Sequence, residues 1–394
     1  MSVLSVNAGS SSLKFSLYPL VQRQVTPQIL TGNIEGLEPG GSPEMRWNFQ
    51  GQSHRRQLNF GAEPVFAQAL SSLRILLASL PDTPAMQAVA HRVVHGGAQY
   101  RASVLVTDAV LADLMQLNAL APLHQPHNLA GVRAFAKAFP DVPQVACFDT
   151  AFHASLPELD YRFALPDALY QQGLRRYGFH GLSYQYVMGE LLAQSSRAKG
   201  RVLMAHLGNG ASLCAAREGR SCATTMGFSA LDGLMMGTRT GALDPGVLLY
   251  LLAQGWDHDR LQTLLYKQSG LLGVSGISAD MRRLRADSSA GAKLAVDMFT
   301  HRVLRESGAL VACLQGLDVL AFSGGIGEHD VALRSDVGLR LAWLGVVIDP
   351  VLNLQATGDR IMAIHAPESA IEVWVVPTDE GVVAAREAAQ LIAA

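Results

Sequence analysis

The sequence predicts an α/β fold built from two similar halves. Short apolar runs rich in β-branched residues alternate along the chain with stretches of helical periodicity. Residues 3–9 and 202–208 each read as an apolar strand that runs into a turn of small residues, at an offset of 199. Two unrelated Gly-rich hairpins would give the same pattern. Further strand–loop units at 319–328 and 373–381 favour a duplicated nucleotide-binding fold.

The first half begins with a strand at 3–7, which a loop of Ala, Gly and Ser joins to its return strand at 13–20. Two more strands, at 45–50 and 56–60, flank polar turns. The other expected elements are helices at 63–80, 108–120 and 128–139 and buried strands at 88–94 and 144–148.

The second half opens in the same way. A strand at 202–207 leads through Gly208-Asn209-Gly210 into a return strand at 211–216. Buried strands at 319–322 and 373–376 then run into loops of small or acidic residues. No low-complexity segment or long polar linker marks a domain boundary.

Length and composition limit the number of domains and the classes of binding partner. At about 150 residues per domain, 394 residues suggest two or three domains. The 31 Lys and Arg against 33 Asp and Glu give a net charge of −2, so no basic excess favours nucleic acid or acidic membranes.

Cysteine spacing and hydropathy limit the kinds of site and the cellular location that fit the sequence. The four cysteines, at 147, 214, 222 and 313, form no C-x-x-C pair, which argues against a disulfide framework or a zinc site. The first 20 residues lack the cationic start of a secretory signal, and no run of 18 apolar residues exists. We expect a cytoplasmic protein with no membrane segment.

Three loops of small residues leave strands, at 7–12, 208–212 and 323–327. Such loops expose backbone N–H groups that bind phosphate oxygens. A Walker A loop is excluded because the chain has no Gly-Lys dipeptide, and the loops lack the third glycine of a dinucleotide fingerprint. One such loop alone is more often a turn, but three favour phosphate binding.

Polar residues lie where buried strands end. Arg92, in His91-Arg92-Val93-Val94-His95, needs an anion to offset its burial, which a structural ion pair would also supply. Asp149 follows the strand at 144–148, where α/β sheets bind ligands, or it caps a helix. His180 and Arg239 lie in Gly-flanked loops, and Glu380 leaves the last strand, as a metal ligand or a first-turn helix carboxylate.

Together these segments resemble the acetate kinase family. The two longest matches are Val3-Leu4-Ser5-Val6-Asn7-Ala8-Gly9-Ser10-Ser11-Ser12-Leu13-Lys14 and Ala88-Val89-Ala90-His91-Arg92-Val93-Val94-His95-Gly96-Gly97. The resemblance continues in family order to residue 380, through segments that include Phe148-Asp149-Thr150, Arg176-Tyr177-Gly178-Phe179-His180-Gly181, His206-Leu207-Gly208-Asn209-Gly210, Met235-Met236-Gly237-Thr238-Arg239 and Gly325-Ile326-Gly327-Glu328.

The resemblance implies the duplicated fold shared by actin, sugar kinases and heat-shock chaperone ATPases, with an active-site cleft between two lobes. Residues 1–149 plus 381–394 would form an N-terminal lobe with the acyl and Mg²⁺ side. Residues 150–380 would form a C-terminal lobe for nucleotide binding and dimerisation, and a homodimer is expected.

The implied activity is reversible, direct in-line transfer of the ATP γ-phosphoryl to a small carboxylate such as acetate, giving acetyl phosphate and ADP. By resemblance, Mg²⁺, or Mn²⁺ in its place, would be held by Asn7 and Glu380. The catalytic residues would be Asp149, Arg92, Arg239, His180 and His124. Arg92, Val94, Leu123, Phe179 and Ala230 would bind the acyl group. The nucleotide would be bound by Lys14, His206, Gly208, Asn209, Gly210, Asp280, Arg282, Gly325, Ile326, Gly327 and Glu328.

These residue types suit the chemistry. Two anions must meet, so cations are needed at the transfer point, and the acceptor carboxylate is already ionised, so no base is essential. Asp149 is therefore expected to orient the acceptor. The sequence departs from the family at Leu182, Tyr184 and Ala230, where Thr, His and Pro are usual.

Two alternatives stay open. A propionate kinase would use the same site with a roomier pocket, and Ala230 bears on that choice because it shortens a side chain near the acyl group. A nucleotide-switch ATPase without kinase activity would need the phosphate loops and metal ligands, but not Arg92, Arg239 and His180 together.

Overall fold

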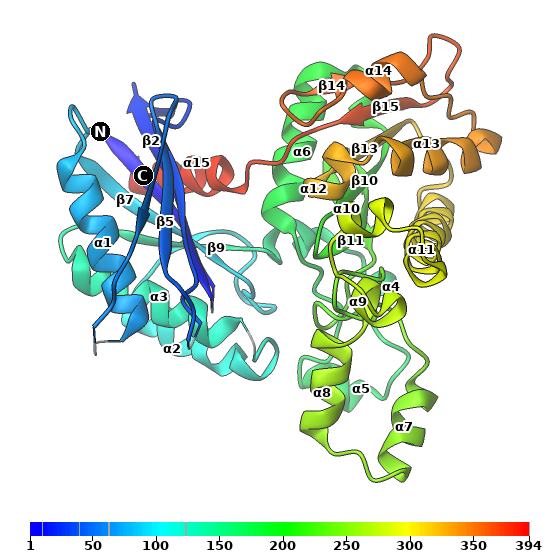
Figure 1. Ribbon diagram of the computed structural model, residues 1–394, viewed down its shortest axis with the longest axis horizontal. Coiled ribbons are helices and arrows are strands. Elements are labelled where there is room, and N and C mark those ends of the chain that lie inside the picture. Colours follow the sequence, from blue (N-terminus) through cyan, green and yellow to red (C-terminus); the bar gives the residue numbers. More distant parts are fainter. Residues whose placement is uncertain (10, 39, 62–63, 123, 394) are drawn as a thin grey trace. The chain divides into compact units, whose positions relative to one another are not determined.

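The computed structural model describes residues 1–9, 11–38, 40–61, 64–122 and 124–393. The chain divides into two compact units (Figure 1). Unit 1 comprises Met1–Ala151 and Asp379–Ala394, and unit 2 comprises Phe152–Thr378. Asp379 and Glu380 thus belong to unit 1, two residues before the boundary expected at 381.

Unit 1 is built on a nine-stranded sheet with the order β6-β5-β4-β2-β1-β7-β9-β8, and β3 pairs with β2. Strands β1, β7 and β9 are parallel, and the strands from β1 outward to β6 pair antiparallel. The strands are β1 (Ser2–Ala8), β2 (Ser12–Val21), β3 (Gln24–Val25), β4 (Leu30–Glu35), β5 (Glu44–Phe49), β6 (Gln52–Gln57), β7 (Met86–Val93), β8 (Val104–Leu105) and β9 (Gln144–Phe148).

Unit 2 repeats this arrangement in a six-stranded sheet of order β12-β11-β10-β13-β15-β14. Strands β10, β13 and β15 are parallel, while β10, β11 and β12 pair antiparallel, so β10 takes the place that β1 has in unit 1. The shared order and directions confirm the duplication expected from the sequence. The strands are β10 (Arg201–Leu207), β11 (Ala211–Arg217), β12 (Arg220–Thr224), β13 (Val319–Ser323), β14 (Met362–Ala363) and β15 (Glu372–Val375).

Helices of unit 1 cover both faces of the inner strands. Alternation along β1 sends Leu4 and Val6 to the face where Leu73 of α1 packs. The last helix, α15, packs against β1 and β7, and its Gly381 lies beside Ser5 on the other face (Figure 1). The helices of unit 1 are α1 (Val65–Ser79), α2 (Asp108–Gln116), α3 (Gln125–Ala138) and α15 (Glu380–Ala393), with a 3-10 turn at Leu117–Ala119.

In unit 2, α6 covers one face of the sheet. Its Val187 and Leu191 pack with Val202 and Met204 of β10. The long helix α11 packs against β10, β11 and β12. The helices are α4 (Glu158–Tyr161), α5 (Asp167–Gln171), α6 (Gly181–Gln194), α7 (Pro245–Ala253), α8 (His258–Lys267), α9 (Gly270–Ser275), α10 (Met281–Ala286), α11 (Ala290–Leu314), α12 (Gly324–His329), α13 (Val331–Arg340) and α14 (Pro350–Gln355), with 3-10 turns at Ala151–Ser155, Ser196–Lys199 and Ala342–Leu344.

The structure corrects several expected elements. The strand expected at 56–60 is β6, earlier in the chain, because Gln50 and Gly51 adopt positive φ and form a tight hairpin turn that sets its register on β5. The helix expected over 108–120 ends at Gln116, and the one expected over 128–139 begins at Gln125.

The loop expected at 323–327 is largely helix. Helix α12 begins at Gly324, directly after β13. The fully buried Arg334 donates from Nη1 to the carbonyls of Gly327 and Glu328, which satisfies acceptors at the end of this glycine-rich helix. Tertiary contacts therefore override the weak helix propensity of glycine.

Candidate functional site

Alternation along β7 decides which of its polar residues faces which layer. Val89 and Val93 face the cores under α1, α2 and α3, and the His91 ring meets Phe135 of α3 edge-on at 5.4 Å. Arg92 therefore points to the opposite face, which α15 covers. Asn7 of β1 lies on that same face, and its antiparallel partner Lys14 shares it.

Arg92 is the centre of a charged cluster in unit 1. Its Nε and Nη2 donate to the two carboxylate oxygens of Asp149 at 3.0 and 2.6 Å, and its Nε lies 3.3 Å from Oε2 of Glu380. Asp149 is 1% exposed, whereas Arg92 and Glu380 keep about a quarter of their side chains exposed. Desolvation lowers the pKa of Arg92, but the charges of Asp149 and Glu380 outweigh this and leave that pKa raised.

Two polar residues of α3 hold the strand ends beside this cluster. Asn128 accepts from the backbone N–H of Val94 at 3.0 Å and donates to the carbonyl of Ala8 at 2.7 Å, which ties the end of β7 to the end of β1. Gln125 bonds both the N–H and the carbonyl of His95. The sequence reading missed both residues because only their buried position in the fold distinguishes them from surface polar residues.

The histidines of this segment are structural. Burial lowers the pKa of His91 to about 4, partly offset by its hydrogen bond to Gln144. Burial likewise lowers the pKa of His95 to about 4, and its Nδ1 accepts from the N–H of Gly97. Both imidazoles are therefore neutral at pH 7.

The residues of unit 1 that were expected to bind the metal and the acyl group lie on several different elements. Glu380 starts α15, next to Asp379, which accepts from the hydroxyl of Tyr18 at 2.9 Å. His124 is exposed at the start of α3, and Val94 is half-buried after β7. Leu123 and Ser10 lie outside the described residues. Within the described part of the chain, no three or more His, Cys, Asp or Glu side chains form a group that could hold a metal ion.

In unit 2, two histidines lie together on the face that α6 covers. His180 precedes α6 in the left-handed conformation, and His206 is the penultimate residue of β10. Their rings stack with centroids 4.3 Å apart. The Nδ1 of His180 lies 2.9 Å from Oγ of Ser212, and the Nδ1 of His206 lies 2.8 Å from Oγ of Ser183.

Gly210 brings the loop at 208–212, which we call the phosphate loop because the sequence predicts phosphate binding there, against two donors. A Cβ atom at Gly210 would lie 3.2 Å from Nε2 of His180 and 3.3 Å from Nη2 of Arg239. Nη1 of Arg239 donates to the carbonyl of Ala230 at 2.8 Å. An imidazole and a guanidinium thus converge on this loop, and a side chain at position 210 would crowd both.

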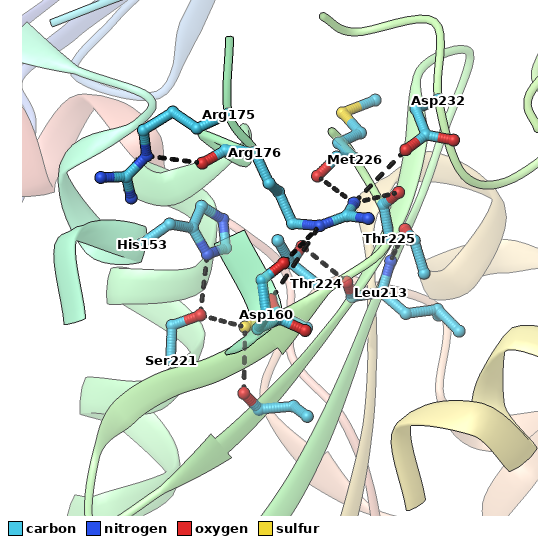
Figure 2. A network of polar contacts seen from close by, with 12 residues as sticks. His153, Asp160, Arg175, Arg176, Leu213, Ser221, Thr224, Thr225, Met226 and Asp232 are labelled. Carbon is cyan, nitrogen blue, oxygen red and sulfur yellow. Dashed lines mark hydrogen bonds and ion pairs between the residues drawn. The ribbon is translucent and has the colours of Figure 1, made fainter. Parts of the chain in front are cut away.

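The segment that carries His180 is fixed by a buried polar network (Figure 2). Nη1 of Arg176 donates to the carbonyls of Thr225 and Met226 and to Oδ2 of Asp232. His153 bonds Ser221 through Nδ1, as Figure 2 shows. Its Nε2 bonds the carbonyl of Phe179. Phe179 itself is buried, so its ring packs in unit 2 while its carbonyl holds His153.

Four of the residues expected to bind the nucleotide, Asp280, Arg282, Gly325 and Ile326, line a cavity of about 800 Å³, a size typical of small-molecule sites. Asp280 and Arg282 form an ion pair of 2.7 Å at its wall, and Arg285 pairs with Asp330 at 3.1 Å. The lining residues are Gly208, Asn209, Ala279, Asp280, Met281, Arg282, Arg285, Gly325, Ile326, His329, Asp330 and Val331.

Gly327 and Glu328 support this cavity and are not in its described lining. Oε1 of Glu328 accepts from the backbone N–H groups of Gly324 and Thr378, at 2.8 and 3.1 Å. Its carboxylate thus joins the start of α12 to the chain after β15.

The duplicated sheets, together with a cavity beside a small-residue loop and histidine and arginine donors at that loop, are typical of an actin-like phosphotransferase. The chain matches the acetokinase family over residues 2–386 and belongs to that family. It is 47% identical over 388 residues to the acetate kinase of Rhodopseudomonas palustris (strain ATCC BAA-98 / CGA009), covering 98% of this chain and 96% of that one. To the acetate kinase of Nitrobacter hamburgensis it is 44% identical, covering 99% and 96%.

Solved structures agree along the whole chain. A propionate kinase from Francisella tularensis superposes with a TM-score of 0.89 at 34% identity, covering 98% of each chain. The acetate kinase of Porphyromonas gingivalis gives 0.87 at 35% identity, covering 99% of each. These comparisons confirm the resemblance and the fold class read from the sequence.

Proposed function

We propose that this enzyme is an acetate kinase, which transfers the γ-phosphoryl of ATP to acetate, reversibly and in line, giving acetyl phosphate and ADP. The observation that carries the proposal is the family match over residues 2–386, together with relatives named acetate kinase at up to 47% identity. Unit 1 would supply the acyl and metal residues, and unit 2 the nucleotide site.

The chain's own residues supply the charge that the transfer needs. Arg92 would bind the acetate carboxylate in place of one of its present carboxylate partners, while Asp149 holds the guanidinium in a fixed plane. Arg239 and His180, which meet at Gly210, would stabilise the oxygens of the moving phosphoryl. His124 would line the acyl side.

The donor chemistry of unit 1 suits Mg²⁺, with Mn²⁺ able to replace it. The amide oxygen of Asn7 and the carboxylate of Glu380 are the hard oxygen ligands that Mg²⁺ takes, and Mg²⁺ keeps several waters. When bound, the ion would neutralise charge on the phosphates. Lys14, on the same sheet face as Asn7, would add a cation beside the nucleotide phosphates.

ATP would place its phosphates along 208–210 and its nucleoside in the cavity that Asp280, Arg282, Gly325 and Ile326 line. Gly327 and Glu328 would keep the cavity wall in place. The volume of about 800 Å³ accommodates a nucleoside without deciding between bases.

Propionate is the second candidate acceptor, because a propionate kinase superposes with a TM-score of 0.89. Val94, Leu123, Phe179 and Ala230 would form the acyl pocket. The small side chain of Ala230 supports room for one more methylene.

We further propose a homodimer that acts in the cytoplasm. Helix α7 is almost entirely apolar, yet none of its residues is buried, and Leu249, Tyr250 and Leu252 are 69, 64 and 50% exposed. An apolar helix in this state is typical of a subunit interface. In the described part of the chain, no helix has the length and apolarity needed to span a membrane.

A hydroxamate assay tests the proposal. The purified protein is incubated with ATP, Mg²⁺ and acetate, propionate or butyrate, and acyl phosphate is trapped as the hydroxamate. Acetate should be a substrate. If ATP is hydrolysed without any acyl hydroxamate, the nucleotide-switch alternative replaces the kinase.

A further inference from the structure

His180 and His206 share an arrangement that the phosphate chemistry alone does not explain. Their rings stack at 4.3 Å, and each ring's Nδ1 faces the hydroxyl of a fully buried serine. The opposite ring edges face the phosphate loop: a Cβ at Gly210 would lie 3.2 Å from Nε2 of His180, and one at Gly208 4.0 Å from Nε2 of His206. Two imidazolium ions this close would repel each other, and Arg239 is a third cation beside them.

The first serine has a second hydroxyl behind it. Oη of Tyr184 lies 2.5 Å from Oγ of Ser212. Burial raises the pKa of Tyr184 well above its ordinary value and outweighs the hydrogen bonding that lowers it, so the phenol keeps its hydrogen. A phenol hydroxyl is more acidic than a serine hydroxyl and is therefore the better donor, so the phenol hydrogen is directed to Oγ of Ser212. The single hydrogen of Ser212 is then available for Nδ1 of His180.

The second serine is held in the same way. Oγ1 of Thr378 donates to Oγ of Ser183 at 2.9 Å, and Ser183 lies 2.8 Å from Nδ1 of His206. The hydrogen of Ser183 is therefore directed to that nitrogen. Thr378 is itself fixed by its backbone N–H, which donates to Glu328.

His153 also has a serine hydroxyl beside its Nδ1, and its other partner determines which ring nitrogen carries the proton. Its Nε2 lies 2.9 Å from the carbonyl of Phe179, which can only accept, so Nε2 carries the proton. Burial lowers the pKa of His153 to about 4, so the ring is neutral and Nδ1 accepts from Ser221 (Figure 2).

We propose that the Tyr184–Ser212 and Thr378–Ser183 hydroxyl pairs are positioning residues that hold His180 and His206 neutral, each with its proton on Nε2. The two rings then present N–H donors to the phosphate loop without adding charge. Only the catalytic consequence of this arrangement rests on the proposed function. The proton positions do not.

The direct test is ¹⁵N-histidine NMR on the full-length protein at neutral pH, with His180→Gln and His206→Gln to assign the signals. Both rings should show a protonated Nε2 and an unprotonated Nδ1, like His153. A protonated Nδ1 on either ring would overturn the proposal. This measurement needs no kinase activity, so it is separate from the failure of the proposed function.

Variants connect the proton position to turnover. Ser212→Ala and Tyr184→Phe should each give a mixture of tautomers at His180 and lower kcat about tenfold, the value of one hydrogen bond, with the KM for acetate unchanged. Ser307→Ala is the matched control, because it removes another buried serine hydroxyl of unit 2, one that donates to the carbonyl of Val303 within α11, and it should leave kcat and the His180 signal unchanged.

An unaltered His180 tautomer and kcat in both variants would contradict a positioning role. An equal loss of kcat in Ser307→Ala would show that the effect is general destabilisation. If the variants fail to fold, the wild-type spectrum still decides the proton positions.

Discussion

Arg92 combines a structural contact with the catalytic role that we propose for it. Its partner Asp149 is almost fully buried, so the guanidinium neutralises a carboxylate that would otherwise be an uncompensated buried charge. The same bidentate contact aligns the guanidinium for a second anion. Arg239, in contrast, is bonded to the carbonyl of Ala230, and its removal strands no buried charge at that contact.

We therefore expect alanine substitution of either arginine to lower kcat to a similar extent but to lower the free energy of unfolding by different amounts. Arg92→Ala and Arg239→Ala should each lower kcat by about 10²–10³, the scale for one charge-stabilising donor. Arg92→Ala should also lower the free energy of unfolding by about 3 kcal/mol, and Arg239→Ala by clearly less. Urea unfolding and initial rates measure both, and full turnover in a folded variant would exclude the catalytic role.

Ala230 tests chain-length selection at a single residue. Ala230→Pro keeps the carbonyl that Arg239 binds but adds ring carbons. A methylene in an apolar pocket is worth about 1–3 kcal/mol, so the wild type should use acetate and propionate with kcat/KM within about a hundredfold, and the variant should favour acetate. An unchanged ratio would remove Ala230 from the pocket wall.

At the scale of elements, the sequence predicted most of the strands that build both sheets because their apolar runs are short and end in small-residue turns. It missed what tertiary contacts decide. The hairpin turn places β6 over an exposed polar segment that has no apolar strand pattern. Hydrogen bonds from buried Arg334 stabilise α12 although that helix is rich in glycine. The sequence places His91 and Arg92 next to each other, and only the alternation of β7 against its neighbouring layers shows that the histidine faces the core and the arginine the opposite face.

The start of α15 carries the expected metal carboxylate. Glu380→Ala should raise the Mg²⁺ concentration needed for half-maximal activity, because one of two protein ligands is lost. Stability should change by no more than about 1 kcal/mol, because Arg92 keeps its bidentate bond to Asp149. Glu44→Ala, which breaks the exposed Arg46–Glu44 pair in the same unit, is the control and should leave the Mg²⁺ titration unchanged.

The pairing of β10 with β13 has a pH-dependent component. Hydrogen bonds from the Arg201 side chain, with its charge and backbone N–H, lower the pKa of Asp318 from 3.8 to about 2. A lowered folded-state pKa stabilises the protein above about pH 4, and this contribution is lost as the pH falls toward 2. Asp318→Asn should therefore cost about 1 kcal/mol at pH 7, after allowing for partial exposure, and progressively less below pH 4. Urea titrations across this range would show a constant difference if the ion pair contributes nothing.

At the scale of the molecule, duplication explains why equivalent positions carry different chemistry. Asn7 and His206 are the penultimate residues of the equivalent strands β1 and β10, at the offset of 199 that the sequence shows. One is proposed as a metal ligand and the other faces the phosphate loop. The strand repeat was readable from the sequence, whereas the buried hydroxyls behind His206 and His180 come from residues far apart in the chain and left no local pattern.

The exposed apolar helix α7 is the surface on which we base the proposed homodimer. If α7 forms the subunit interface, Leu249→Asp combined with Tyr250→Asp should bury two charges there and convert the dimer to a 42.1 kDa monomer, as measured by light scattering after gel filtration. The control is Trp343→Ser, which changes another exposed apolar residue of unit 2 and should leave the dimer intact. Dissociation by Trp343→Ser alone would move the interface away from α7, and a monomeric wild type would remove the homodimer from the proposal.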